Sequence, residues 1–169
     1  AYYNRSILKG QAGDYMGGIY FYYGPEYGGK LTVCNNNVAG FEDAQILFYD
    51  DTTDASEVEI TGNILAGGHY GIWTDGYTIE DGSIFSISRN NISGFDVDGI
   101  NLGEIWGAKL AITENKITGN NSSNGVFFDA TDGINSGAEV NIAHNCIVGV
   151  QDGVDVEKVS DTAFMNVNQ

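Results

Sequence analysis

The carboxylates are the residues of this sequence whose number and spacing could do chemistry. Asp and Glu total 23, against 7 Lys and Arg. We predict that Asp50 and Asp75 face outward on neighbouring sequence repeats, about 5 Å apart. Two carboxyl groups at that separation are the pair that retaining glycosidases use. Asp50 and Asp75 are therefore the candidate catalytic residues.

Calcium binding is the second chemistry that these carboxylates could support. Ca²⁺ takes six to eight oxygen ligands, many of them from Asp. The candidate ligands are Asp50, Asp51, Asp54, Asp75 and Asp129. No EF-hand loop is present, and the alternative interpretation is a solvated acidic rim. Calcium is the only cofactor that the sequence suggests.

Aromatic side chains recur at outward positions of the same repeats and form a candidate ligand-binding face. Its members are Tyr20, Tyr22, Leu47, Tyr49, Trp73 and Phe127. Flat rings stack on the C–H faces of sugars, and large exposed apolar patches mark contacts. Three interpretations stay open: burial under loops, a polysaccharide groove, or a surface for contact with other proteins.

Charge and composition exclude several partners. The formal net charge of −16 should repel nucleic acid and anionic lipid. No apolar run approaches the roughly 20 residues of a membrane span, so we expect no membrane insertion. The chain has 24 Gly and 1 Pro, which favours many short strands and tight turns.

The elements that place these residues follow from an internal repeat. The pattern apolar–any–Gly recurs every 25–30 residues, at Gly10, Gly40, Gly67, Gly94, Gly119 and Gly149. Four residues earlier, five of the six repeats have an asparagine: Asn36, Asn63, Asn90, Asn115 and Asn145.

Each repeat contains three short segments in which apolar residues alternate with others, which predicts three strands. Strands this short cannot bury a core singly, but coils stacked with parallel pairing can. We therefore predict an all-β solenoid of about six coils. The asparagines should form a structural ladder at a turn that needs left-handed backbone geometry.

The phrases at 89–94, 114–119 and 144–149 resemble the repeats of right-handed parallel β-helix proteins of the pectate-lyase-like superfamily. The resemblance covers essentially the whole chain. It implies right-handed winding and a polysaccharide groove along the strand that carries the aromatic residues. It is specific for the fold and carries little about function, because this superfamily hosts many activities.

The catalytic groups that such enzymes need are scarce here. Elimination requires a basic residue beside Ca²⁺ on the groove, but the two arginines, Arg5 and Arg89, fall near the asparagine turn. Hydrolysis of the polygalacturonase type needs paired carboxylates with a histidine nearby. Only Asp50-Asp51 and the Gly-His-Tyr phrase at 68–70 resemble that set.

We therefore expect residues 1–169 to form one β-helix domain, as part of a longer protein or as a protomer that stacks end to end. The favoured function is an extracellular or cell-surface structural module. Its partners would be a polysaccharide or neighbouring copies of itself. A polysaccharide lyase or glycoside hydrolase acting on the same face is the alternative.

Overall fold

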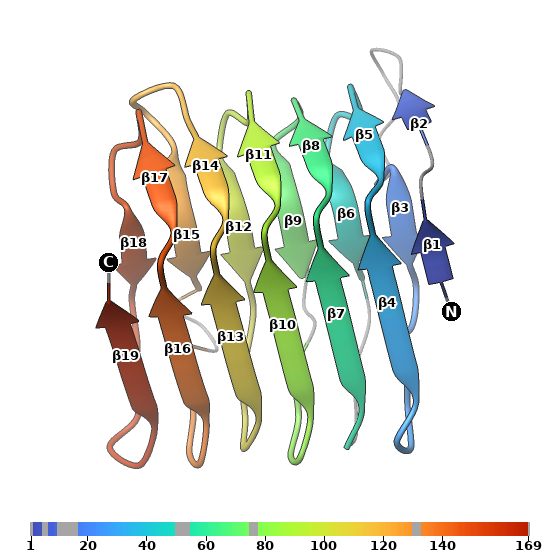
Figure 1. Ribbon diagram of the computed structural model, residues 1–169. Helices are drawn as coiled ribbons and strands as arrows, with labels where there is room; N and C mark the ends of the chain where they lie inside the picture. Colours follow the sequence, from blue (N-terminus) through green and yellow to red (C-terminus); the bar gives the residue numbers. More distant parts are fainter. Residues whose placement is uncertain are drawn as a thin grey trace.

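The computed structural model describes residues 2–4, 7–9, 17–49, 55–74, 78–129 and 133–168, the first two ranges as backbone. Within these ranges all regular structure is β-strand, in three parallel sheets (Figure 1). The described residues contain no helix with the length and apolar character needed to cross a membrane.

Sheet A has seven strands that pair parallel and in register. They are β1 (Tyr2–Asn4), β4 (Lys30–Cys34), β7 (Glu57–Thr61), β10 (Ile84–Ser88), β13 (Lys109–Thr113), β16 (Glu139–Ala143) and β19 (Phe164–Asn168). Each strand after β1 has five residues, alternating between the core and the outer face.

Sheet B is built from strands of three residues that follow those of sheet A after a short turn. They are β2 (Ile7–Lys9), β5 (Asn37–Ala39), β8 (Ile64–Ala66), β11 (Asn91–Ser93), β14 (Lys116–Thr118) and β17 (Cys146–Val148).

Sheet C contains the strands that the sequence singled out for outward aromatic residues. They are β3 (Ile19–Phe21), β6 (Ala44–Phe48), β9 (Tyr70–Thr74), β12 (Asp98–Leu102), β15 (Asn124–Phe128) and β18 (Val154–Val156). Isolated parallel bridges between sheets C and A link Ile79, Ile105, Ile134 and Val159 in four successive coils.

The winding of the chain matches the prediction of a right-handed parallel solenoid. Strands of sheets A and B run upward at the front while the chain advances from right to left, and sheet C descends behind them (Figure 1). The core is filled by the predicted apolar columns, such as Val33, Ile60, Ile87 and Ile112, all fully buried. Aromatic rings also stack between coils, with Phe21 and Phe48 centroids 4.8 Å apart.

The asparagine ladder is present at the turn between sheets A and B. Asn63 and Asn90 are each 1% exposed. Asn63 Nδ2 donates to Asn90 Oδ1 at 2.9 Å and to the Val33 carbonyl at 3.0 Å. Asn90 Oδ1 also accepts from the Asn63 backbone N–H at 2.9 Å. The same pattern continues through Asn115 to Asn145, so each amide satisfies buried backbone groups of the coils beside it.

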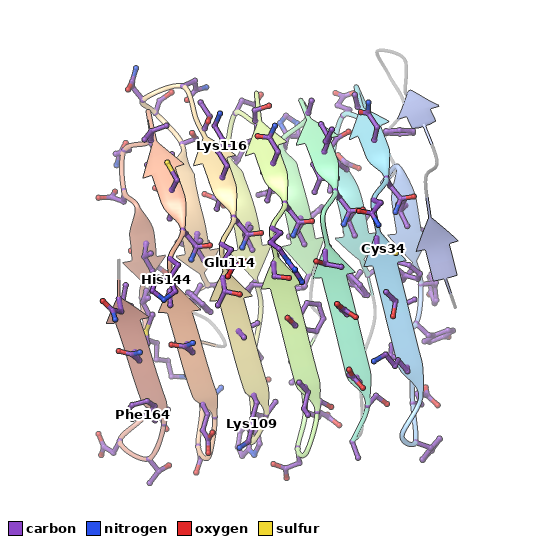
Figure 2. All side chains as sticks on the ribbon, in the orientation of Figure 1. Cys34, Lys109, Glu114, Lys116, His144 and Phe164 are labelled. Atoms are coloured by element: carbon purple, nitrogen blue, oxygen red, sulfur yellow. The ribbon has the colours of Figure 1, made fainter. Side chains whose placement is uncertain are left out.

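One detail of the turn corrects the sequence-based interpretation. The left-handed residue is the one before each ladder asparagine, not the asparagine itself: Asn35, Gly62, Arg89, Glu114 and His144 have φ between 55° and 67°. Glu114 and His144 lie at this junction of the two sheets (Figure 2). A non-glycine residue in this conformation costs about 1–2 kcal/mol. The buried amide bonds that follow hold the backbone there.

Replacing the central ladder residue tests how much these bonds stabilise the fold. Asn90→Ala leaves the Asn63 N–H and the Ile60 carbonyl without their side-chain partner. Each unsatisfied buried group costs about 1–3 kcal/mol, so we expect a loss of about 3 kcal/mol in the free energy of unfolding, measured by urea denaturation. Asn91→Ala is the matched control, since Asn91 is exposed. Equal losses for the two variants would contradict a structural ladder.

Candidate functional site

On the outer face of sheet C, an aromatic pair of β9 flanks a closely packed glycine. In β9, Gly71 lies between Tyr70 and Trp73, and a Cβ there would be 2.3 Å from Ile92 Cγ2 and 2.5 Å from the Gly99 carbonyl. Only glycine allows this approach of sheets B and C. The rings of Tyr70 and Trp73 stack on each other, with centroids 4.6 Å apart.

A cluster of tyrosines occupies the N-terminal part of this face. Tyr22 and Tyr49 have ring centroids 5.5 Å apart, and Tyr20 lies 6.4 Å from Tyr22 and 6.2 Å from Tyr49. Tyr23 adds an edge contact with Tyr22 at 4.7 Å. Three of the four rings are exposed: Tyr22 by 49%, Tyr23 by 62% and Tyr49 by 47%. We call Tyr20, Tyr22, Tyr23 and Tyr49 the tyrosine cluster.

The other predicted members of the aromatic face are less accessible. Trp73 and Phe127 are half-buried, and Leu47 is only 3% exposed. Leu47 packs against Gly17, where a Cβ would be 2.6 Å from the Leu47 Cβ. The residues of the predicted face therefore lie side by side on neighbouring strands. Their side chains are exposed to solvent mainly at the tyrosine cluster and, in part, at Trp73.

Asp98 is a buried carboxyl group at the start of β12 that the sequence analysis does not single out. It is 2% exposed and accepts a hydrogen bond from Asn101 Nδ2 at 2.7 Å. Its register neighbours are Tyr70 and Asn124. Burial raises the pKa of Asp98, and hydrogen bonds from Asn101 and Asn124 offset part of that rise. The repeat could have identified Asp98 as a member of this face, because it occupies the same position in its repeat as Tyr70 does in the preceding one.

His69 and Asp96 form a side-chain hydrogen bond at the edge of the same face. His69 Nδ1 lies 2.7 Å from Asp96 Oδ1, and both side chains are exposed. The hydrogen bond with Asp96 raises the pKa of His69; burial acts in the opposite direction, and the charges of Asp96, Asp43 and Glu42 add to the rise. His69 is thus held by a carboxylate near the Tyr70–Trp73 stack.

The acidic rim of the sequence is visible where the chain passes from sheet C to sheet A. A hollow of about 370 Å³ is lined there by Thr78, Glu80, Asp81, Glu104 and Trp106. The Glu104 carboxylate is hydrogen-bonded within the chain, because its Oε1 accepts from Asn135 Nδ2 at 2.7 Å. The other two carboxylates of the hollow, Glu80 and Asp81, are exposed to solvent, and the Trp106 indole beside them is half-exposed.

The predicted catalytic pair, Asp50 and Asp75, lies outside the described residues, as do the candidate calcium ligands Asp51 and Asp54. Asp129 is described and half-buried at the end of β15. Among the residues that the structure describes, no group of three or more His, Cys, Asp or Glu side chains could hold a metal ion. Because Asp129 is the only one of the five candidate calcium ligands that is described, calcium binding stays a prediction.

The fold and this face define the chain as a parallel β-solenoid with an aromatic and acidic outer sheet. In comparisons with known proteins, no family model, curated protein or solved structure matches the chain.

The buried Asp98 predicts an unusual pH dependence of stability. A raised pKa means that the folded state binds the proton more tightly than the unfolded state, so Asp98 lowers stability as the pH rises above 3.8. Asp98→Asn should therefore be more stable than the wild type at pH 7. The difference should shrink as the pH falls towards 4, measured by urea unfolding across that range.

Asp152→Asn is the control for this experiment, because it removes one negative charge from an exposed position two coils further along the same sheet. A stability difference between wild type and Asp98→Asn that stays constant from pH 4 to pH 8 would contradict the assignment.

Proposed function

We propose that this chain is an extracellular β-solenoid module that binds polysaccharide through the outer face of sheet C. The observation that carries the proposal is the exposed tyrosine cluster, with ring centroids between 4.7 and 6.4 Å apart. An extracellular setting and the pectate-lyase-like resemblance belong to the same proposal.

The chemistry of the cluster suits a sugar chain. A phenol ring offers an apolar face for sugar C–H groups and a hydroxyl that exchanges hydrogen bonds with sugar hydroxyls. The stacked Tyr70 and Trp73 rings provide a second platform further along the same sheet. A rigid solenoid holds both platforms at a fixed spacing, so little ordering is needed when a polymer binds.

The charge of the chain selects among polysaccharides. A net charge of −16 disfavours an anionic polymer unless a divalent cation bridges the two. Neutral polysaccharides are thus the preferred class, and a calcium-dependent gain for anionic ones is the outcome expected if the acidic loops bind Ca²⁺.

Affinity electrophoresis with neutral and anionic polysaccharides, with and without Ca²⁺, tests the proposal. Retardation by at least one polymer is expected, and Tyr22→Ala/Tyr49→Ala should weaken it roughly tenfold, equivalent to about 1.4 kcal/mol. Tyr27→Ala is the matched control, because Tyr27 is 85% exposed and, within the described part of the chain, has no ring contact with the cluster.

Two outcomes would contradict the binding proposal. One is the absence of retardation by every polymer tested, and the other is a double variant that binds as well as the wild type. Circular dichroism of each variant verifies that a loss of binding is not a loss of fold.

A carbohydrate-active enzyme is the second candidate, and Asp98 is the observation that favours it. Carboxyl groups with raised pKa values serve as general acids in glycosidases, and burial raises the pKa of Asp98 on this face. Against this, only 2% of Asp98 is exposed, so a glycosidic oxygen has no direct access to it.

We therefore expect no cleavage. Incubation with pectin, alginate and neutral polysaccharides should release neither reducing nor unsaturated ends over a day, measured by reducing-sugar assay and absorbance. Release that Asp98→Asn abolishes would instead establish the enzyme and assign Asp98 as its acid. End-to-end stacking of copies stays a prediction alongside the binding role.

A further inference from the structure

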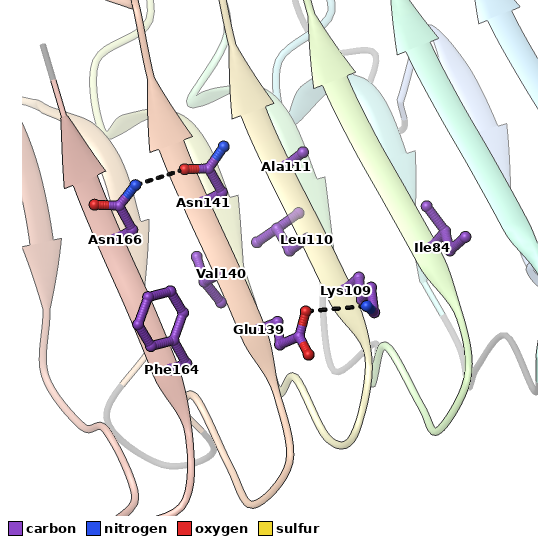
Figure 3. A pocket seen from close by; sticks show the side chains of 9 residues that line it. All are labelled: Ile84, Lys109, Leu110, Ala111, Glu139, Val140, Asn141, Phe164 and Asn166. Atoms are coloured by element: carbon purple, nitrogen blue, oxygen red, sulfur yellow. Dashed lines mark hydrogen bonds and ion pairs between the residues drawn. The ribbon is translucent and has the colours of Figure 1, made fainter.

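The outer face of sheet A carries a hollow that none of the predicted sites includes. Its volume is about 270 Å³, and it extends across strands β10, β13, β16 and β19. Ile84 and Phe164 stand at its two ends, and the Lys109–Glu139 pair and the small side chain of Ala111 lie between them (Figure 3). We call these five residues the β10–β19 patch.

The patch contains two large apolar side chains that no described residue of the chain covers. Ile84 is 51% exposed and Phe164 is 64% exposed, although both belong to regular strands. Parallel register places Ile84 beside Lys109, Lys109 beside Glu139, and Glu139 beside Phe164. The order along the solenoid axis is therefore apolar, positive, negative, apolar.

The patch is also electrically neutral on a strongly acidic chain. Lys109 Nζ lies 3.1 Å from Glu139 Oε2. The next outward column of the same strands holds Ser86, Ala111, Asn141 and Asn166, with no charge. Two copies of a chain with net charge −16 repel each other over most of their surfaces, and this face is one where that repulsion is locally absent.

We propose that two copies of this chain associate face to face through the β10–β19 patch. A two-fold axis in the interface, parallel to the strands and midway between β13 and β16, reverses the order of the column in the second copy. Ile84 then meets Phe164 of the second copy, and Lys109 meets Glu139. The column is self-complementary in the way an isologous interface requires.

The ion pair within each chain does not prevent this contact. An ammonium group has three donors, so Lys109 can bond Glu139 of its own chain and that of the second copy. The exposed Phe164 ring of each copy enters the hollow beside Ile84 of the other. Ala111 provides the space for this approach, because its side chain is a single methyl group.

The size of the patch sets the strength of the association. Four strands about 4.8 Å apart, with five residues at about 3.3 Å each, give a footprint of about 300 Å² on each copy. This is well below the roughly 800 Å² per partner of a stable interface. The interface therefore belongs to the small, weak class, and we expect association only at high micromolar to millimolar concentration.

Sedimentation velocity of the full chain at 0.15 M NaCl, from about 10 µM to 1 mM, tests the proposal. The wild type should show a concentration-dependent rise in its weight-average sedimentation coefficient. Lys109→Glu alone and Glu139→Lys alone should each abolish that rise, because like charges then face each other across the interface. A wild type that stays monomeric at 1 mM overturns the proposal.

Mixing the two single variants separates contact between copies from contact within a chain. The mixture places two carboxylates of one copy against two ammonium groups of the other, while the ion pair within each chain stays broken. Heterodimers should form at least tenfold more tightly than the wild-type dimer. No association in the mixture would overturn the assigned geometry.

Lys30→Glu is the matched control. It breaks an exposed pair with Glu57 at 2.6 Å on the same sheet, and it changes the net charge as Lys109→Glu does. Self-association should survive Lys30→Glu and should be lost in Phe164→Ala. Equal losses for Lys30→Glu and Lys109→Glu would show that net charge, and not this patch, controls association.

Discussion

Parallel pairing in strict register is the constraint on which the rest of this structure depends. Each strand lies beside its equivalent from the coil before, so each side chain stacks on the side chain at the same position one coil away. A residue type that suits one coil is therefore repeated down a column. The core and the asparagine ladder are columns of this kind, whereas the outer faces are columns of mixed residue types that the same register aligns.

The same constraint explains what could be predicted from the sequence. The three strands per coil, the inward apolar columns and the Asn36–Asn145 ladder follow from spacing alone, and the structure has them. The position of the left-handed residue did not follow, because asparagine tolerates that geometry well and the pattern pointed to it. The backbone instead turns at the preceding residue, such as Arg89 or Glu114, so that the amide can reach inward.

The outer faces were harder to predict than the core, since exposure depends on the neighbours of a column as well as on its own residues. Leu47 and Asp98 belong to outer columns and are nevertheless buried, Leu47 against Gly17 of the preceding segment. The β10–β19 patch does not follow from the sequence pattern, because its five members are of five different residue types. Only the register, which sets Ile84, Lys109, Glu139 and Phe164 side by side, reveals it. Sheets A and C form different faces of the solenoid, with A at the front and C behind the strands of sheet B (Figure 1), so contact through one leaves the other free for a ligand.

The ladder makes the resistance of the solenoid to force depend on the direction of pulling. Its amide bonds and the strand pairing both run along the solenoid axis, with Nδ2 of Asn36, Asn63, Asn90 and Asn115 each donating to the asparagine of the following coil. A force along the axis loads these bonds in tension, one coil boundary at a time. A force along the strands loads all the bonds of a strand together, in shear. The molecule should therefore resist pulling across its axis better than pulling along it, and it should yield coil by coil when stretched end to end.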